Sequence, residues 1–123
     1  MAEYKTINTS VMVMNDVITA ALGPINVQVT NFKHTNEETI LVWNIPEGGG
    51  MFDPDNPFTW NTMNTDPDPP AVKRVNDRQL QSAPYKNTVA GDATLTWVYT
   101  VRINKAGQRI GIDPEVDNLP PNP

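Results

Sequence analysis

The stretch ATLTWVYTVRI, from Ala93 to Ile103, decides the fold because its side chains alternate between two faces. Apolar residues occupy one face, and threonine and arginine occupy most of the other. A period of two over this length predicts a β-strand with one buried face. The apolar face comprises Ala93, Leu95, Trp97, Tyr99, Val101 and Ile103, and the polar face comprises Thr94, Thr96, Thr100 and Arg102.

The residues after this strand predict that the chain reverses its direction. Asn104–Gly107 supplies turn residues, and Gln108–Ile112 then resumes the alternation. Two alternating segments joined by a short turn are typical of a β-hairpin. We therefore expect antiparallel strands that share one buried face.

Further strands are predicted along the rest of the chain. Residues 25–30 alternate, residues 39–43 form a nearly continuous apolar run, and shorter strands fit residues 71–75 and 79–85. About six to eight strands separated by turns, without crossover helices, are typical of a two-sheet sandwich or a small barrel. We predict an all-β, antiparallel two-sheet sandwich in a single domain over residues 1–123.

Residues 15–22 allow two interpretations. In the first, Asn15 or Asp16 caps a short helix that ends before Pro24. The buried face of that helix would consist of Val17, Ile18, Ala21 and Leu22. In the second, residues 11–14 form an edge strand and the remainder is a loop.

Two segments rich in proline are predicted to lack regular structure. Residues 51–70 contain many Pro, Asp and Asn residues and are expected to form a long loop. Residues 118–123 end in the sequence LPPNP and are expected to form an extended tail.

Composition excludes several classes of function. The formal net charge is −5, and the nine Lys and Arg residues are scattered, so nucleic acids and anionic membranes are not expected partners. The chain has no cysteine, which excludes disulfides, zinc-thiolate sites, iron–sulfur clusters and thiol nucleophiles.

The first residues do not have the pattern of a signal peptide. Lys5 lies near Glu3, and Asn15 and Asp16 interrupt the apolar segment Val11–Leu22. No apolar run reaches the length that spans a bilayer, so membrane insertion is not expected. We expect a cytoplasmic protein unless a leader peptide has been removed.

The order of these features resembles small bacterial β-sandwiches of the cupredoxin-like or immunoglobulin-like kind. The resemblance covers residues 25–117 and rests on a strand ending in Trp43, the Pro/Asp-rich loop, the strand Trp97–Val101 and the closing segment Ile112–Val116. It implies a fold and leaves the activity open.

The copper site of the cupredoxins does not carry over to this chain. That site uses two His ligands and one Cys, usually with a Met. Here Cys is absent, His34 is the single histidine, and no Met follows Met63. A lone histidine such as His34 is expected to be exposed or singly hydrogen-bonded.

Other catalytic motifs are also missing from the sequence. Ser10 and Ser82 are the two serines, and neither has the context of a nucleophile elbow. Gly48–Gly50 is followed by Met-Phe-Asp-Pro, which does not begin the helix that a phosphate-binding loop requires.

Acidic residues cluster at three places: Asp53 with Asp55, Asp66 with Asp68, and Asp113 with Glu115 and Asp117. Alternate carboxylates in a loop can converge on Ca²⁺, and the third cluster is the preferred candidate for such a site. No other cofactor is expected. Equally, Asp and Pro together form ordinary turns, because Asp accepts local backbone hydrogen bonds and Pro fixes φ.

The best candidates for a binding surface are three aromatic residues in the long loop, Phe52, Phe58 and Trp60. Loops on a rigid scaffold often carry binding residues, and an exposed Trp beside polar groups can stack on a sugar or anchor a protein. In the alternative interpretation, these rings fold inward and cap one end of the sandwich.

Two classes of function remain. The first is a non-catalytic β-sandwich module that binds a protein partner, another copy of itself or a glycan. The alternative is a small enzyme or calcium-dependent domain that uses dispersed carboxylates.

Overall fold

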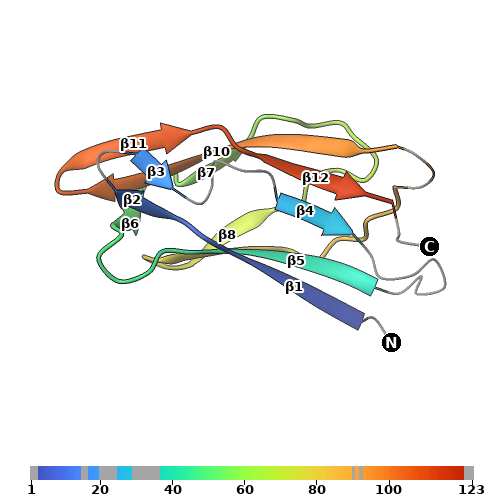
Figure 1. Ribbon diagram of the computed structural model, residues 1–123, viewed down its shortest axis with the longest axis horizontal. Coiled ribbons are helices and arrows are strands. Elements are labelled where there is room, and N and C mark those ends of the chain that lie inside the picture. The colour runs from blue at the N-terminus through green and yellow to red at the C-terminus, as the bar shows by residue number, and fades with distance from the viewer. Residues whose placement is uncertain are drawn as a thin grey trace.

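The fold is a sandwich of two β-sheets (Figure 1), which confirms the predicted fold class. The computed structural model describes residues 3–14, 17–19, 25–28, 37–89, 91 and 93–120. Every described element of regular structure is a strand. The described residues also contain no helix long and apolar enough to cross a membrane.

Four strands form the first sheet. Their order across the sheet is β1 (Glu3–Ser10), β5 (Glu37–Asn44), β9 (Gln79–Ser82) and β8 (Val72–Asn76). Neighbours pair in antiparallel fashion except β1 and β5, which run parallel over the whole length of both strands. The parallel pairing was not predicted from the sequence.

The second sheet is built around the long strand β10. β11 (Gln108–Ile112) and β12 (Glu115–Leu119) pair along one edge of β10 (Leu95–Lys105), and β6 (Met51–Phe52) and β7 (Phe58–Trp60) pair along its other edge. β12 also pairs with β4 (Ile25–Gln28). β4 runs parallel to β12. A separate small hairpin consists of β2 (Met12–Met14) and β3 (Val17–Thr19).

β11 and β12 act as one strand that is interrupted for two residues. Val101 pairs with Ile112 and Val98 pairs with Glu115, so the register does not change across the interruption. The Tyr99 amide donates to the carbonyl of Pro114 at 3.0 Å, which continues the ladder between the two pairs. The predicted hairpin is therefore confirmed, and it runs along the whole of β10.

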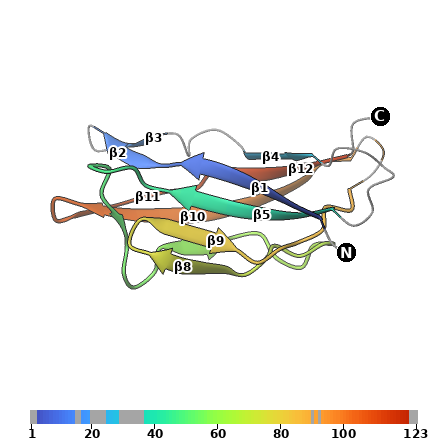
Figure 2. The same cartoon turned by 90° about the horizontal axis from the view of Figure 1, so that it is seen from below.

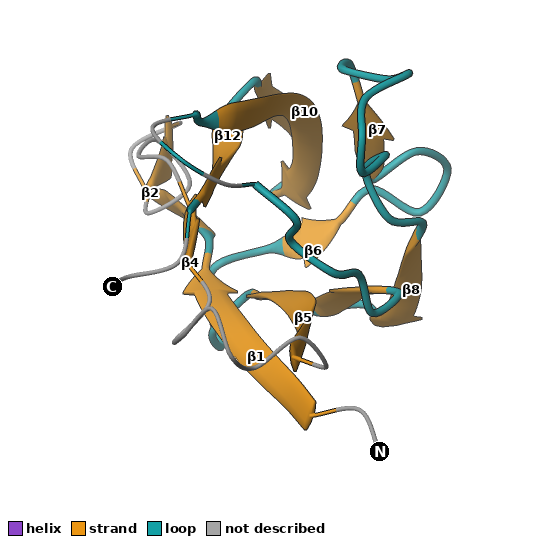
Figure 3. Ribbon diagram, turned by 90° about the vertical axis from the view of Figure 1, so that its right-hand side faces the viewer, coloured by secondary structure: helices purple, strands orange, loops and turns teal. Residues whose placement is uncertain are grey.

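The core lies between the two sheets, which the end view in Figure 3 separates into a layer with β10, β12 and β7 and a layer with β1, β5 and β8. Trp97, Tyr99, Val101 and Ile103 are fully buried, which confirms the predicted inward face of β10. Opposite them, the first sheet contributes the buried side chains of Leu41, Trp43 and Leu80.

Three predicted segments differ in the structure. β3 covers residues 17–19, so the helix predicted over 15–22 is wrong at these positions, and its other residues lie outside the described part of the chain. β12 continues to Leu119, so the predicted tail at 118–123 begins inside a strand. The long loop at 51–70 includes β6 and β7, because β10 offers its second edge to both.

Candidate functional site

A shallow hollow of about 300 Å³ lies beside Trp60, where β7 leads into the loop of residues 61–71. We call it the Trp60 hollow. It is lined by Trp60, Thr62, Met63, Asn64, Asp68 and Pro69.

The position of the Trp60 ring is fixed by the strand that carries it. Trp60 pairs with Tyr99 across β7 and β10, and its indole Nε1 donates to the Pro70 carbonyl at 2.6 Å. Its ring meets Phe58 and Trp97 edge to face, with centroids 4.9 Å and 5.5 Å away. The ring is half-buried, so it supports the core and also forms a wall of the hollow.

Hydrogen bonds within the loop hold the other side of the hollow. The Thr65 amide donates to Asp68 Oδ1 at 2.8 Å, and the Thr65 hydroxyl donates to the Pro67 carbonyl at 2.7 Å. Trp97 Nε1 donates to the same hydroxyl at 3.0 Å, which ties the loop to the core. Asn64 has a φ of 62°, a left-handed conformation that Asn tolerates better than most residues.

The lining combines an apolar half with a polar half. Trp60, Met63 and Pro69 supply apolar surface, and Met63 is 65% exposed. The polar half consists of a hydroxyl, an amide and a carboxylate from Thr62, Asn64 and Asp68, and none of the six lining residues is cationic. Such a surface can stack a flat apolar face while it hydrogen-bonds groups at the rim.

The three aromatic residues singled out in the sequence occupy different environments. Phe52 is fully buried, so it presents no surface to a partner. Phe58 is half-buried and stacks on Tyr99, with centroids 4.9 Å apart, beside Trp43 at 4.8 Å. Of the three, Trp60 alone lines the hollow.

The acidic cluster at residues 113–117 is spread along one line of the second sheet. Asp113 accepts a hydrogen bond from the Thr100 hydroxyl, and Asp117 accepts one from the Thr96 hydroxyl at 2.8 Å. Glu115 lies between them, opposite Val98. Within the described residues, no three His, Cys, Asp or Glu side chains are placed to hold a metal ion together.

Asp53 belongs to a polar network that sequence reasoning missed. Its carboxylate accepts hydrogen bonds from the Asn56 amide at 3.0 Å and from Asn104 Nδ2 at 3.1 Å, and it lies 3.2 Å from Arg109 Nη2. Burial alone raises the pKa of Asp53, but these hydrogen bonds and the charges of Arg109 and Arg102 outweigh it and lower the pKa. Arg109 thus supplies the positive charge beside Asp53, which belongs to one of the three acidic clusters considered for Ca²⁺.

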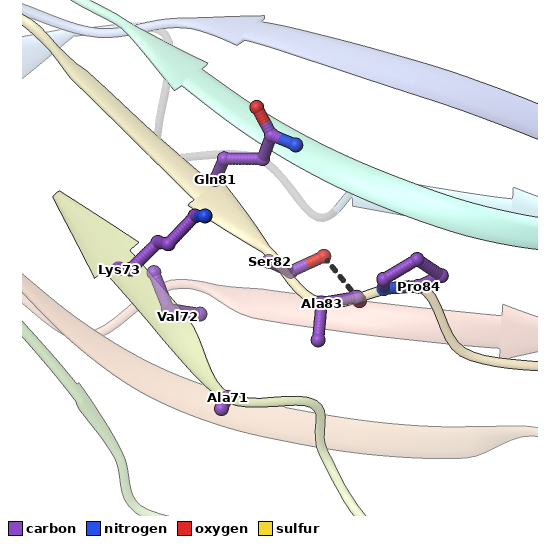
Figure 4. Close-up of a pocket in the computed structure, with 7 residues that line it drawn as sticks. All are labelled: Ala71, Val72, Lys73, Gln81, Ser82, Ala83 and Pro84. Atoms are coloured by element: carbon purple, nitrogen blue, oxygen red, sulfur yellow. Dashed lines mark hydrogen bonds between the residues drawn. The ribbon is translucent and has the colours of Figure 1, made fainter. Parts of the chain in front are cut away.

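A second hollow, of about 280 Å³, lies beside β8 and β9 (Figure 4). It is lined by Ala71, Val72, Lys73, Gln81, Ser82, Ala83 and Pro84. The one hydroxyl in this lining, that of Ser82, already donates to the Ala83 carbonyl at 3.0 Å and accepts from the Leu41 amide at 2.9 Å. The Trp60 hollow therefore offers the richer set of binding groups.

Sequence reasoning found part of the Trp60 hollow and missed the rest. It singled out Trp60, and it noted Asp68 only as an acidic neighbour of Asp66. Met63 and Asn64 carried no signal, because their place beside Trp60 depends on the path of the loop. His34 lies outside the described residues.

No protein-family model matches the sequence, and no curated protein matches it. The assignment of a function therefore rests on the geometry described above.

Proposed function

We propose that this chain is a non-catalytic, immunoglobulin-like binding module that holds a sugar ring of a glycan in the Trp60 hollow. The observation that carries the proposal is the half-buried indole of Trp60 beside the polar groups of Thr62, Asn64 and Asp68.

The order of the strands supports the immunoglobulin-like part of the proposal. An immunoglobulin domain has strands B, E and D side by side in one sheet and strands C, F and G in the other. Here β5, β9 and β8 fit the first set, and β7, β10 and the β11–β12 line fit the second. β1 and β4 depart from this plan because they run parallel to their neighbours.

The chemistry of the lining favours a neutral sugar. One face of a sugar ring carries C–H groups that pack on an aromatic ring, while its hydroxyls donate to carboxylates and amides. Asp68 and Asn64 supply those acceptors, and Met63 and Pro69 extend the apolar wall. An anionic sugar is disfavoured because the described lining residues supply a carboxylate and no cation.

A glycan array followed by fluorescence tests the proposal. Trp43 and Trp97 are fully buried, so quenching of tryptophan fluorescence by acrylamide reports mainly on Trp60. We expect a glycan from the array to protect Trp60 from quenching. Met63→Ala and Asn64→Gly should weaken binding about tenfold, which corresponds to roughly 1.4 kcal/mol.

The two variants leave the backbone of the hollow intact. Glycine accepts the left-handed conformation of residue 64, and Met63 is mostly exposed. Met51→Ala is the matched control, because Met51 is 47% exposed and lies on β6, away from the hollow. Failure of every glycan to bind, or equal binding by all three variants, would contradict the proposal.

A further inference from the structure

β1 is the strand at one edge of the first sheet, and β8 is the strand at the opposite edge (Figure 2). Within the described part of the chain, β1 pairs with β5 and with no other strand. The pairing runs from Glu3 opposite Glu37 to Ser10 opposite Asn44 without a register shift. A regular strand of this length carries a row of backbone donors and acceptors on its second side.

The other side of the same sheet carries features that block a further strand. β8 is shorter, and its register shifts between Arg74 and Asn76. Lys73 is exposed on it, and Arg74 donates to the carbonyls of Phe52 and Asp53. Bulges and cationic side chains are devices that keep edge strands from pairing with other molecules.

β1 has neither a bulge nor a proline, and its residues Glu3 and Lys5 are opposite in charge.

The side chains of β1 alternate between the two faces of the sheet. Tyr4, Thr6, Asn8 and Ser10 are exposed, and Lys5, Ile7 and Thr9 are half-buried. Ile7 also packs against the core. Any strand added beside β1 must match this alternation, because a shift by one residue would place core-facing side chains on the outer face.

We propose that β1 pairs with β1 of a second copy of this chain, antiparallel about a twofold axis, so that two four-stranded sheets become one continuous sheet. In the register that we infer, Ile7 lies opposite Ile7 of the second copy. Thr6 then lies opposite Asn8, Tyr4 opposite Ser10, and Lys5 opposite Thr9. Exposed residues meet exposed residues, and no like charges face each other.

A second copy fits this edge better than a charged partner does. β1 has no net charge, and in this register its sequence is complementary to itself. Sliding the register by two residues keeps the faces matched, but it would oppose Ile7 to Lys5 in place of the apolar pair. Since each chain carries a formal net charge of −5, the copies repel at long range, and added salt should strengthen the dimer.

Sedimentation of the full chain tests the pairing. Between micromolar and millimolar protein, we expect the mass to rise from that of one chain to twice that value. Thr6→Lys should weaken the dimer, because in this register the two added ammonium groups are diagonal neighbours on the same face of the joined sheet. Val75→Lys is the matched control: Val75 is 47% exposed on β8, and this variant should dimerise as the wild type does.

A crosslink tests the register, since the chain has no cysteine of its own. Ile7→Cys should form a covalent dimer on oxidation, and Val75→Cys should remain mostly monomeric under the same conditions. A monomer at all concentrations would overturn the proposal, and so would a dimer that Thr6→Lys does not weaken. A dimer that Thr6→Lys weakens but Ile7→Cys does not crosslink would overturn the register.

Discussion

At the scale of single residues, the inward face of β10 contributes four fully buried side chains to the core, those of Trp97, Tyr99, Val101 and Ile103. Trp97 is fully buried, its ring meets Tyr85 at 5.0 Å, and its Nε1 is hydrogen-bonded. Thr96 on the opposite face is half-buried and donates to Asp117. The two neighbours in sequence therefore have very different environments.

Replacement of these two residues measures that difference. We expect Trp97→Ala to lower the free energy of unfolding by about 3 to 5 kcal/mol, the usual cost of removing a large buried aromatic ring. Thr96→Ala should lower it by about 1 kcal/mol, the net value of one hydrogen bond. Urea denaturation of both variants provides the measurement, and equal losses would contradict the inward assignment of Trp97.

Tyr99 makes the protein sensitive to alkaline pH. Burial raises the pKa of Tyr99 to about 12, although the hydrogen bond that its hydroxyl accepts from Trp43 Nε1, at 3.1 Å, acts in the opposite direction. The folded protein thus holds the phenolic proton more tightly than the unfolded chain, whose tyrosines lose it near pH 10.

The sign of the effect on stability follows from this difference. Below pH 10 both states keep the proton, so the free energy of unfolding does not depend on Tyr99. Between pH 10 and 12 the unfolded state loses its proton first, and stability falls. Urea midpoints measured across this range should drop less steeply for Tyr99→Phe than for the wild type. A residual drop is expected, because burial also raises the pKa of Tyr85.

At the scale of elements, Gly50 allows β6 to approach β10. Its φ is +99°, and a Cβ there would lie 2.8 Å from the Asn104 carbonyl oxygen and 3.0 Å from Ile103 Cγ2. Gly48 has a similar φ of +85°, but a Cβ at that position would meet no atom within 4 Å. A substitution at Gly48 therefore tests backbone strain alone, and a substitution at Gly50 tests backbone strain together with a steric clash.

Alanine at each position tests this distinction. Gly48→Ala should cost about 1 to 2 kcal/mol, the strain of a left-handed residue. Gly50→Ala should cost about 1 to 3 kcal/mol more, since the strand must also move away from β10. Chemical denaturation of the two variants gives both values. Similar costs would show that the close approach of β6 to β10 adds no steric cost at residue 50.

Asp53 connects β6 with β10 and β11 and makes this region sensitive to acid. Its pKa is lowered, so Asp53 contributes stability above its ordinary value of 3.8, and this contribution is lost as the pH falls through the folded value. Asp53→Asn keeps the shape of the side chain but removes the charge that faces Arg109. Its free energy of unfolding should therefore fall less on acidification than that of the wild type, as measured by urea titrations at neutral and acidic pH.

At the scale of the whole molecule, calcium distinguishes the binding module from the calcium-dependent alternative. Thr100 and Thr96 already donate to the carboxylates of Asp113 and Asp117. We expect Ca²⁺ added to EDTA-treated protein to leave the melting temperature unchanged, because only a ligand that binds the native state raises it. A rise that Asp117→Asn removes would revive the alternative.

The sequence by itself determined the fold class, the long hairpin and the buried face of β10. These features are local: a period of two over residues 93–103, followed by turn residues, leaves few other structures open to the chain. The same reasoning singled out Trp60, with Phe52 and Phe58, as a candidate binding residue, because an aromatic ring in a loop rich in Pro and Asp is visible without knowledge of its neighbours.

Only the tertiary structure decided which residues surround Trp60 and which strands lie at the edges of the sheets. Asn64 and Asp68 reach the hollow through the path of the loop, and Arg109 reaches Asp53 across β10. β1 lies beside β5 although residues 11–36 separate the two strands in sequence. Such contacts join distant parts of the chain, and they depend on the packing of the whole molecule, which no local pattern encodes.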